Sequence, residues 1–308
     1  MINYSFIIPH KNTPDLLQKC IDSIPRRDDV QIIVVDDNSD ADKVDFDHFP
    51  GLNDSAVEVY LTKEGRGAGY ARNVGLSHAI GKWIVFADAD DFFMPDISTA
   101  MDEYVNTEWD IVFFKASSLE LCSGKPSNRE QHINQAVDNA LLSNDYKLFY
   151  GLSTPYCKFI KKSLIDLHNI LFEEVRWSND VVFSAKVIAN AKSIAASSFQ
   201  IYCITRSNNS LTSNVSLECK KCRFQESIKE MKILKSMVRR NNEFHFWFYR
   251  SWYDVYKVSR YSGIAFLPKC LFLGGKRFII NFNKAFFVDE YNRSNHIKKL
   301  YQSIKRRK

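Results

Sequence analysis

Residues 83–91 read WIVFADADD, so that an apolar run of strand-forming residues leads directly into a cluster of aspartates. A short apolar run of this kind, bounded by turn-forming residues, is typical of a buried strand. Asp88 and Asp90 therefore lie just beyond the carboxyl end of a strand and, with one residue between them, point the same way. Open α/β sheets bind their ligands at this edge. The stretch predicts an α/β fold with a ligand site where this strand ends.

Strands and helices alternate on both sides of this stretch. Further strands are expected at residues 4–8, 31–35, 57–61, 110–114, 156–160 and 198–204. Helical patterns occupy residues 13–24, opened by Thr13 as N-cap and Pro14, and residues 68–80, about 133 onward, and 179–190. The alternation predicts a mainly parallel sheet flanked by helices and joined by right-handed crossovers.

Composition sets the broad class of the protein. The 308 residues are 45% hydrophobic and 25% charged, which is ordinary for a globular protein. No signal peptide and no membrane-spanning apolar run are expected. The seven scattered cysteines favour reduced thiols in a cytoplasm over a disulfide framework.

The character of the chain changes after about residue 213. Residues 1–213 carry the α/β pattern, whereas residues 214–308 carry long helical patterns, an aromatic segment at 244–261 and a basic tail. This predicts two domains. Aromatic residues interleaved with Arg and Lys fit contact with an anionic membrane surface. Ordinary core packing and an oligomer interface are the alternatives.

Several acidic and thiol groups are candidate metal ligands. Asp88 and Asp90 offer the hard oxygen ligands that Mg²⁺ or Mn²⁺ prefers, and the alternative is that they cap the next helix. Residues 36–47 imitate a calcium loop but lack its glycine and its final glutamate. Cys219 and Cys222 form a single C-x-x-C, which is weak evidence for zinc.

Basic and polar loops provide further candidates. Gly65, Gly67 and Gly69, with Arg66 and Arg72, form a basic turn opening a helix, which suits either a phosphate or plain solvation. Asp180 lies in the first turn of a later helix, where it either caps the helix or faces a cleft. Residues 206–212 form a polar loop, beginning with Arg206, that suits phosphate contacts.

Taken in order, these segments resemble family 2 glycosyltransferases. The matching motifs are Ile8-Pro9-His10-Lys11-Asn12, Val35-Asp36-Asp37-Asn38-Ser39, Gly69-Tyr70-Ala71-Arg72-Asn73, Phe86-Ala87-Asp88-Ala89-Asp90-Asp91, Ser178-Asn179-Asp180 and Ser210-Leu211-Thr212. The resemblance is close over residues 3–115 and looser over residues 155–213.

The resemblance implies a GT-A fold, an inverting transfer from a nucleotide-diphosphate sugar, with UDP favoured, and Mn²⁺ or Mg²⁺ as cofactor. It makes residues 1–213 the catalytic domain, Asp180 the general base and Asp90 the metal ligand. The expected donor-binding residues are Pro9, His10, Lys11, Asp37, Arg72, Asp88, Ala89, Asp90 and Arg206.

The sequence departs from the family pattern at two sites. Asn179 stands where the family has Glu before the base, and His10-Lys11 replaces the usual hydrophobic-Tyr pair. The Q-x-x-R-W motif of processive members is absent, which favours transfer of a single sugar.

The resemblance also bears on partners and location. The expected acceptor is a glycan or lipid-linked glycan of bacterial polysaccharide or lipopolysaccharide synthesis. Residues 214–308 are expected to contact the acceptor, the inner face of a membrane or a second copy, and no nucleic-acid partner is expected. The alternatives for the whole chain are a non-catalytic nucleotide-sugar-binding protein and a sugar nucleotidyltransferase.

Overall fold

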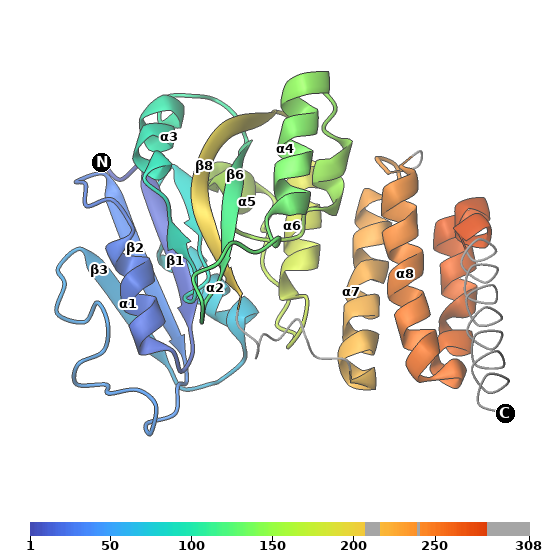
Figure 1. Ribbon diagram of the computed structural model, residues 1–308, viewed down its shortest axis with the longest axis horizontal. Helices are drawn as coiled ribbons and strands as arrows, with labels where there is room; N and C mark the ends of the chain where they lie inside the picture. Colours follow the sequence, from blue (N-terminus) through green and yellow to red (C-terminus); the bar gives the residue numbers. More distant parts are fainter. Residues whose placement is uncertain (207–215, 239–240, 282–308) are drawn as a thin grey trace, which may run out of the picture. The chain divides into compact units, whose positions relative to one another are not determined.

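A computed structural model of the protein describes residues 1–206, 216–238 and 241–281. The chain divides into two compact units, Met1–Val215 and Ser216–Lys308 (Figure 1). The domain boundary predicted at residues 213 and 214 lies outside the described residues. Each unit is described by itself.

The first unit is built on one eight-stranded sheet. Its strands are β1 (Tyr4–His10), β2 (Val30–Asp37), β3 (Val57–Thr62), β4 (Trp83–Phe86), β5 (Phe92–Phe93), β6 (Ile111–Glu120), β7 (Lys158–Lys161) and β8 (Ile194–Arg206). They lie in the order β3-β2-β1-β4-β7-β6-β8-β5. The pairs among β1 to β4 and the pair β6–β8 are parallel, whereas β7 and β5 pair antiparallel with their neighbours. The predicted mainly parallel sheet is confirmed.

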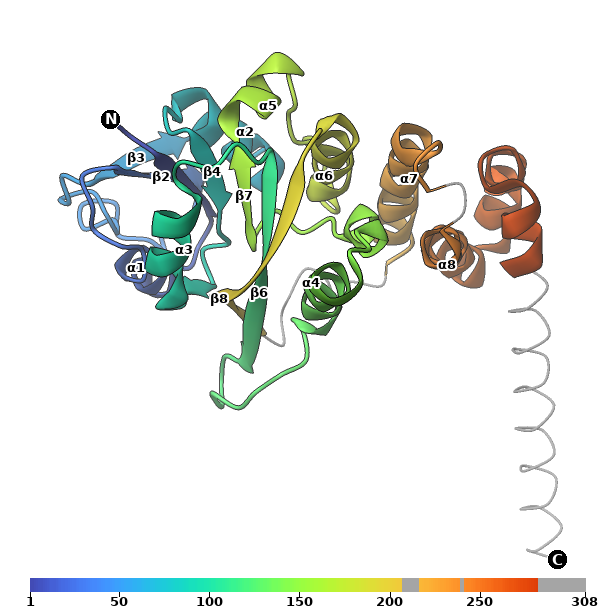
Figure 2. The same ribbon diagram turned by 90° about the horizontal axis from the view of Figure 1, so that it is seen from above.

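Helices cover both faces of this sheet. They are α1 (Pro14–Asp22), α2 (Ala68–His78), α3 (Asp96–Tyr104), α4 (Gln131–Ser143), the 3₁₀ helix η1 (Lys147–Gly151), α5 (Lys162–Leu167) and α6 (Asn179–Asn190). Figure 2 shows α1, α3 and α4 on one side of the sheet and α2, α5 and α6 on the other. Because both faces are covered, the central strands need apolar residues throughout, and all seven residues of β1 are buried.

The structure differs from the sequence prediction in several local features, among them α5 and η1, which were not predicted. Thr13 occupies the N-cap position of α1, but its side chain makes no capping hydrogen bond. Its backbone N–H instead donates to Nε2 of His10, 3.0 Å away, so the helix entry is held from β1. The two-residue strand β5 was not predicted, because two residues are too few to show a period.

The second unit contains α7 (Leu217–Leu234), α8 (Asn242–Val258) and further helical residues over 260–281, interrupted at Gly275, whose φ is +53°. Tyr249 and Trp252 of the aromatic segment are buried and pack against Phe278, with ring centroids 5.6 and 5.3 Å apart. Trp247 of the same segment is exposed. No helix within the described ranges is long and apolar enough to span a membrane.

Gly81 provides a test of the packing at the start of β4. A Cβ atom on Gly81 would lie 2.6 Å from the backbone nitrogen of Ser5, in a strand that cannot move aside. We expect Gly81→Ala to lower the free energy of unfolding by about 1–3 kcal/mol, measured by urea denaturation. Gly151→Ala is the matched control, since nothing lies within 4 Å of its Cβ position. Equal stability of the two variants would contradict the close approach.

Candidate functional site

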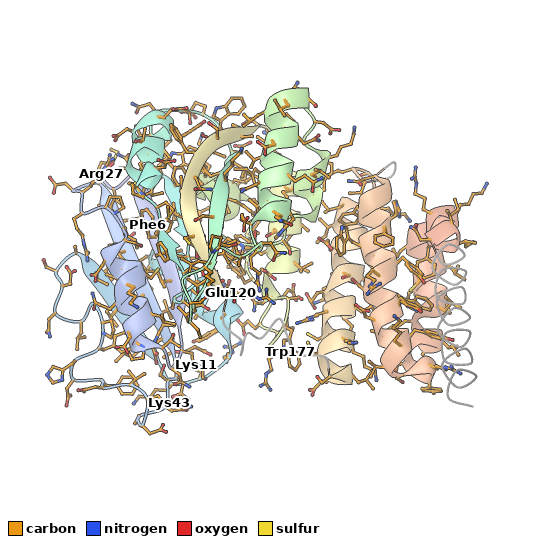
Figure 3. All side chains as sticks on the ribbon, in the orientation of Figure 1. Phe6, Lys11, Arg27, Lys43, Glu120 and Trp177 are labelled. Carbon is orange, nitrogen blue, oxygen red and sulfur yellow. The ribbon has the colours of Figure 1, made fainter. Side chains whose placement is uncertain are left out.

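The carboxyl ends of three adjacent parallel strands meet at one edge of the sheet. The register of β1 on β2 pairs His10 with Asp36, and that of β1 on β4 pairs Ile7 with Phe86. Lys11, which follows β1, and Asp37, which ends β2, therefore lie at the same edge as the aspartates that follow β4. Figure 3 shows Lys11 and Trp177 toward this edge of the unit.

The turn that carries the aspartates is held in place by β8. The Tyr202 hydroxyl accepts a hydrogen bond from the backbone N–H of Asp88 at 2.9 Å. The backbone N–H of Thr205 donates to Oδ1 of Asp91 at 2.7 Å, and its hydroxyl donates to the carbonyl of Asp90 at 2.6 Å. The carboxylate of Asp91 is thus committed to the fold, and the turn projects Asp88 and Asp90 from a fixed backbone.

The three carboxylates of this turn fit a divalent cation. Ligand oxygens of Asp88, Asp90 and Asp91 all lie within 4.8 Å of one another. Burial, and then the charge of Asp88, raise the pKa of Asp90 to about 6. Burial and both neighbours also raise the pKa of Asp91. Crowded carboxylates of this kind suit Mg²⁺ or Mn²⁺.

No other metal-binding group of three His, Cys, Asp or Glu residues occurs among the described residues, so Cys219 and Cys222 belong to none. Asp90 is in addition free of ion pairs within this part of the chain. It is therefore the carboxylate of the turn with most capacity left for a metal ion.

Arg72 connects this turn to the start of α6. Its Nη2 atom donates to Oδ1 of Asp88 at 2.6 Å, and its Nη1 atom donates to Oδ1 of Asn179 at 2.8 Å. Its guanidinium carbon lies 5.3 Å from the centre of the Phe172 ring. Arg72 is buried, and its Nε atom has no hydrogen-bond partner within the described residues. A buried cation with an unused donor is a ready site for an anionic ligand.

The segment before α6 is docked on α2. The side chain of Asn73 makes two hydrogen bonds with the backbone of Phe172, accepting from its N–H at 2.8 Å and donating to its carbonyl at 3.0 Å. A Cβ atom on Gly69 would lie 2.3 Å from the carbonyl oxygen of Glu173, so only glycine permits this approach. Adjacent positions on α2 therefore fix the path of the chain toward Asp180.

Asp180 lies in the first turn of α6, which begins directly after a residue in an uncommon conformation. Ser178 has a φ of +58°, in the left-handed region that few non-glycine residues adopt. Asp180 is partly buried. Burial raises the pKa of its carboxyl group, Asp88 adds to this, and the charges of Arg72 and Lys158 oppose it. A raised pKa suits a carboxylate that has to accept a proton near neutral pH.

Asp37 presents one free carboxylate oxygen. Its Oδ2 atom accepts from the backbone N–H of Gly67 at 2.8 Å, whereas its buried Oδ1 atom has no hydrogen-bond partner in the part of the chain that the structure describes. Burial raises the pKa of this carboxyl group. The ammonium group of Lys11 donates to the Asp37 carbonyl at 3.0 Å. An acceptor and a neighbouring cation are therefore available to a ligand.

Both ring nitrogens of His10 make hydrogen bonds within the fold. Its Nδ1 atom lies 2.7 Å from Oδ1 of Asp36, and its Nε2 atom accepts from Thr13. Burial would raise the pKa of Asp36, but hydrogen bonds from His10 and Ser39 outweigh it and hold that pKa below its usual value. Pro9 and Ala89 are buried at the same edge.

Arg206 lies at the exposed end of β8, where its Nη1 atom is 3.3 Å from Oε1 of Glu120. The remainder of its loop, including Ser210-Leu211-Thr212, lies outside the described residues. The basic tail beyond residue 281 does so as well.

Two cationic residues near the site were not foreseen. Lys158 on β7 is 3% exposed, donates to the carbonyl of Leu152 at 3.0 Å, and interacts electrostatically with Asp180. Burial lowers its pKa to about 8. Arg129 acts electrostatically on Asp90. Lys158 sits in a strand-like run and Arg129 in an irregular polar segment, and neither has a motif around it.

Known proteins share this sequence pattern and fold. The sequence profile of glycosyl transferase family 2 matches residues 5–166. A poly(ribitol-phosphate) beta-glucosyltransferase of Bacillus spizizenii is 28% identical over 203 residues, which cover 63% of this chain but 30% of that protein. A GalNAc(5)-diNAcBac-PP-undecaprenol beta-1,3-glucosyltransferase of Campylobacter jejuni is 26% identical, with 68% of this chain and 67% of that protein covered.

Solved structures agree on the fold. Residues 1–349 of Staphylococcus aureus TarS match with a TM-score of 0.59 at 18% identity, covering 96% of this chain and 92% of that one. A mannosyltransferase of Pyrobaculum calidifontis, in complex with GDP-Man and Mn²⁺, matches with a TM-score of 0.55 at 14% identity, covering 91% and 85%. The predicted GT-A fold is confirmed.

Removing one carboxylate tests the metal site. Asp90→Asn keeps the shape of the side chain but removes a charge, so we expect Mn²⁺ affinity to fall by more than about tenfold, measured by calorimetry on the purified protein. Asp42→Asn, at an exposed loop position, is the matched control and should bind as the wild type does. Undiminished binding by Asp90→Asn would place the ion elsewhere.

Proposed function

The chain belongs to glycosyl transferase family 2, and on that premise we propose that it is an inverting, metal-assisted glycosyltransferase. It moves one sugar from a nucleotide-diphosphate donor, UDP-sugar by preference, to a hydroxyl group of a glycan or lipid-linked glycan. The arrangement around Arg72 carries the proposal, because one buried cation contacts both the aspartate turn and the start of the helix that bears Asp180.

The hydrogen-bonding groups of Asp37 and Lys11 fit a uracil base. The pairing edge of uracil presents one N–H between two carbonyl groups, whereas guanine presents two adjacent donors. Asp37 has one carboxylate oxygen free, and the Lys11 ammonium group is a donor close to it. TarS has been solved with UDP-GlcNAc and with UDP, which agrees with this assignment.

Asp90, with Asp88 beside it, would hold Mn²⁺ or Mg²⁺, which when bound neutralises charge on the diphosphate. Arg72 adds a fixed positive charge toward the same group through its unused Nε donor. Because Asn179 is neutral, its hydrogen bond positions the guanidinium group without cancelling its charge.

Asp180 acts as the general base. Its carboxylate takes the proton from the acceptor hydroxyl while that oxygen bonds to the anomeric carbon. The bond from this carbon to the diphosphate breaks on the opposite face, and the nucleotide diphosphate leaves with the electron pair. An α-linked donor thus gives a β-linked product.

The acceptor and the location are also proposed. The C. jejuni relative is named for a polyprenol-linked substrate, which supports a lipid-linked acceptor and a place at the cytoplasmic face of a membrane. Residues 214–308 are assigned to contacts outside the donor site, with the acceptor, the membrane surface or a second copy.

Thermal stabilisation by UDP-, GDP-, CMP- and dTDP-sugars, each with and without Mn²⁺, tests the donor site. We expect a Mn²⁺-dependent shift with a UDP-sugar. In Asp37→Asn the amide nitrogen would replace the free oxygen and oppose the base N–H, so donor affinity should fall by about tenfold or more. Asp42→Asn again serves as control. Absence of a shift with every donor would overturn the proposal, whereas donor binding without turnover would favour a non-catalytic binding protein.

Replacing Asp180 tests the chemical step. Asp180→Asn should lower kcat by roughly 10²–10⁴-fold, the usual contribution of a general base, and should leave the dissociation constant of the donor unchanged. Nucleotide release gives the rate, and Asp166→Asn on α5 is an exposed control. Near-normal turnover in Asp180→Asn would contradict the assignment of Asp180 as the general base.

The pH profile follows from the environment of Asp180. Because burial raises its pKa above the ordinary 3.8, Asp180 takes up a proton at a higher pH than an exposed aspartate. The base is active only when ionised, so kcat should fall as the pH falls through this raised value.

A further inference from the structure

The charges of the chain are separated by sign. Residues 1–215 carry 20 Lys and Arg against 29 Asp and Glu, a net charge of −9. Residues 216–308 carry 22 against 7, a net charge of +15. The overall value of +6 therefore conceals a strongly cationic second unit, which favours an anionic partner for that unit.

The helical residues 260–281 expose several large apolar side chains. Tyr261, Ile264 and Phe272 are 86%, 59% and 77% exposed, and all three precede Gly275, whose φ of +53° departs from helical geometry. Spacings of 3 and 8 residues return to the same side of an α-helix, so these three residues form one outward stripe. We call them the outer stripe.

The opposite side of this helix is the buried one. Cys270 and Leu273 are buried there, and Phe278, which lies beyond Gly275, packs on Tyr249 and Trp252 of α8. The Trp252 indole N–H donates to the carbonyl of Gly263 at 2.8 Å. The helix is thus fixed to the unit by one side, and the outer stripe is apolar surface facing away from that core.

Cations border the outer stripe. The ammonium group of Lys235, which follows the end of α7, lies 4.9 Å from the centre of the Phe272 ring. Lys269 is exposed and flanks the stripe by its helical position, and Lys276 is exposed directly after Gly275. At a bilayer surface, apolar side chains insert at the boundary of the acyl chains while cations contact the anionic headgroups. An apolar stripe with ammonium groups beside it fits such a surface.

We propose that the outer stripe binds the surface of an anionic lipid bilayer, with the helical residues 260–274 lying parallel to it. A second copy of the chain would have to bring together two surfaces of the same high positive charge. A soluble polyanion would use the lysines but leave Ile264 and Phe272 in water. The inference goes beyond the proposed transfer activity and does not depend on it, so the two can fail separately.

The test uses the full chain and flotation with vesicles of phosphatidylcholine, with or without phosphatidylglycerol. We expect binding to the anionic vesicles to exceed binding to neutral ones by about tenfold and to weaken at high salt. The double variant Ile264→Ser, Phe272→Ser should bind the anionic vesicles at least about fivefold less than the wild type does. The control is Ile80→Ser, Leu142→Ser, which removes two equally exposed apolar side chains of the first unit and should bind as the wild type does.

Circular dichroism and light scattering accompany the flotation. All four positions are exposed, so both variants should keep the wild-type spectrum and melting temperature. Full vesicle binding by the Ile264, Phe272 double variant would overturn the proposal. A wild-type dimer that dissociates in this double variant would also overturn the proposal. Binding to soluble polyphosphate without binding to vesicles would do so as well.

Discussion

The contact of Arg72 with Asp88 and Asn179 is the constraint on which the site depends. A buried guanidinium group costs free energy unless its donors are used, and here two of its nitrogens reach groups from different parts of the chain. One belongs to the turn after β4 and the other to the first residue of α6. The relative position of the aspartate turn and the candidate base is therefore set by one side chain of α2.

The aspartate turn is stabilised by contacts with residues that lie far along the chain. Burial, and then the mutual repulsion of carboxylates this close, raise the pKa values of Asp90 and Asp91. Tyr202 and Thr205 on β8 hold the backbone against that repulsion. These hydrogen bonds from β8 keep the negative site preformed, which would reduce the reorganisation needed to bind a cation there.

The fold and the donor edge of the site could be predicted because their signals are local. Apolar runs give the strands, and Asp37 and Asp88 follow two of them directly. The contacts of Arg72 could not be predicted, because they join residues 16 and 107 positions apart. The burial of Lys158 could not be predicted either, because a lysine in a strand-like run looks the same whether it is buried or solvated. The contact of His10 with Asp36, 26 positions away, was missed for the same reason as those of Arg72, and its local bond with Thr13 was not foreseen.

The anchoring of the segment before α6 has an evolutionary consequence. Its two ends, Phe172 and Asn179, are held by the adjacent residues Asn73 and Arg72. Between these anchors, Trp177 is buried and Ser178 has a φ of +58°, whereas Arg176 is exposed. The exposed position can therefore change its charge by single substitutions while the anchors, and with them the start of α6, stay in place.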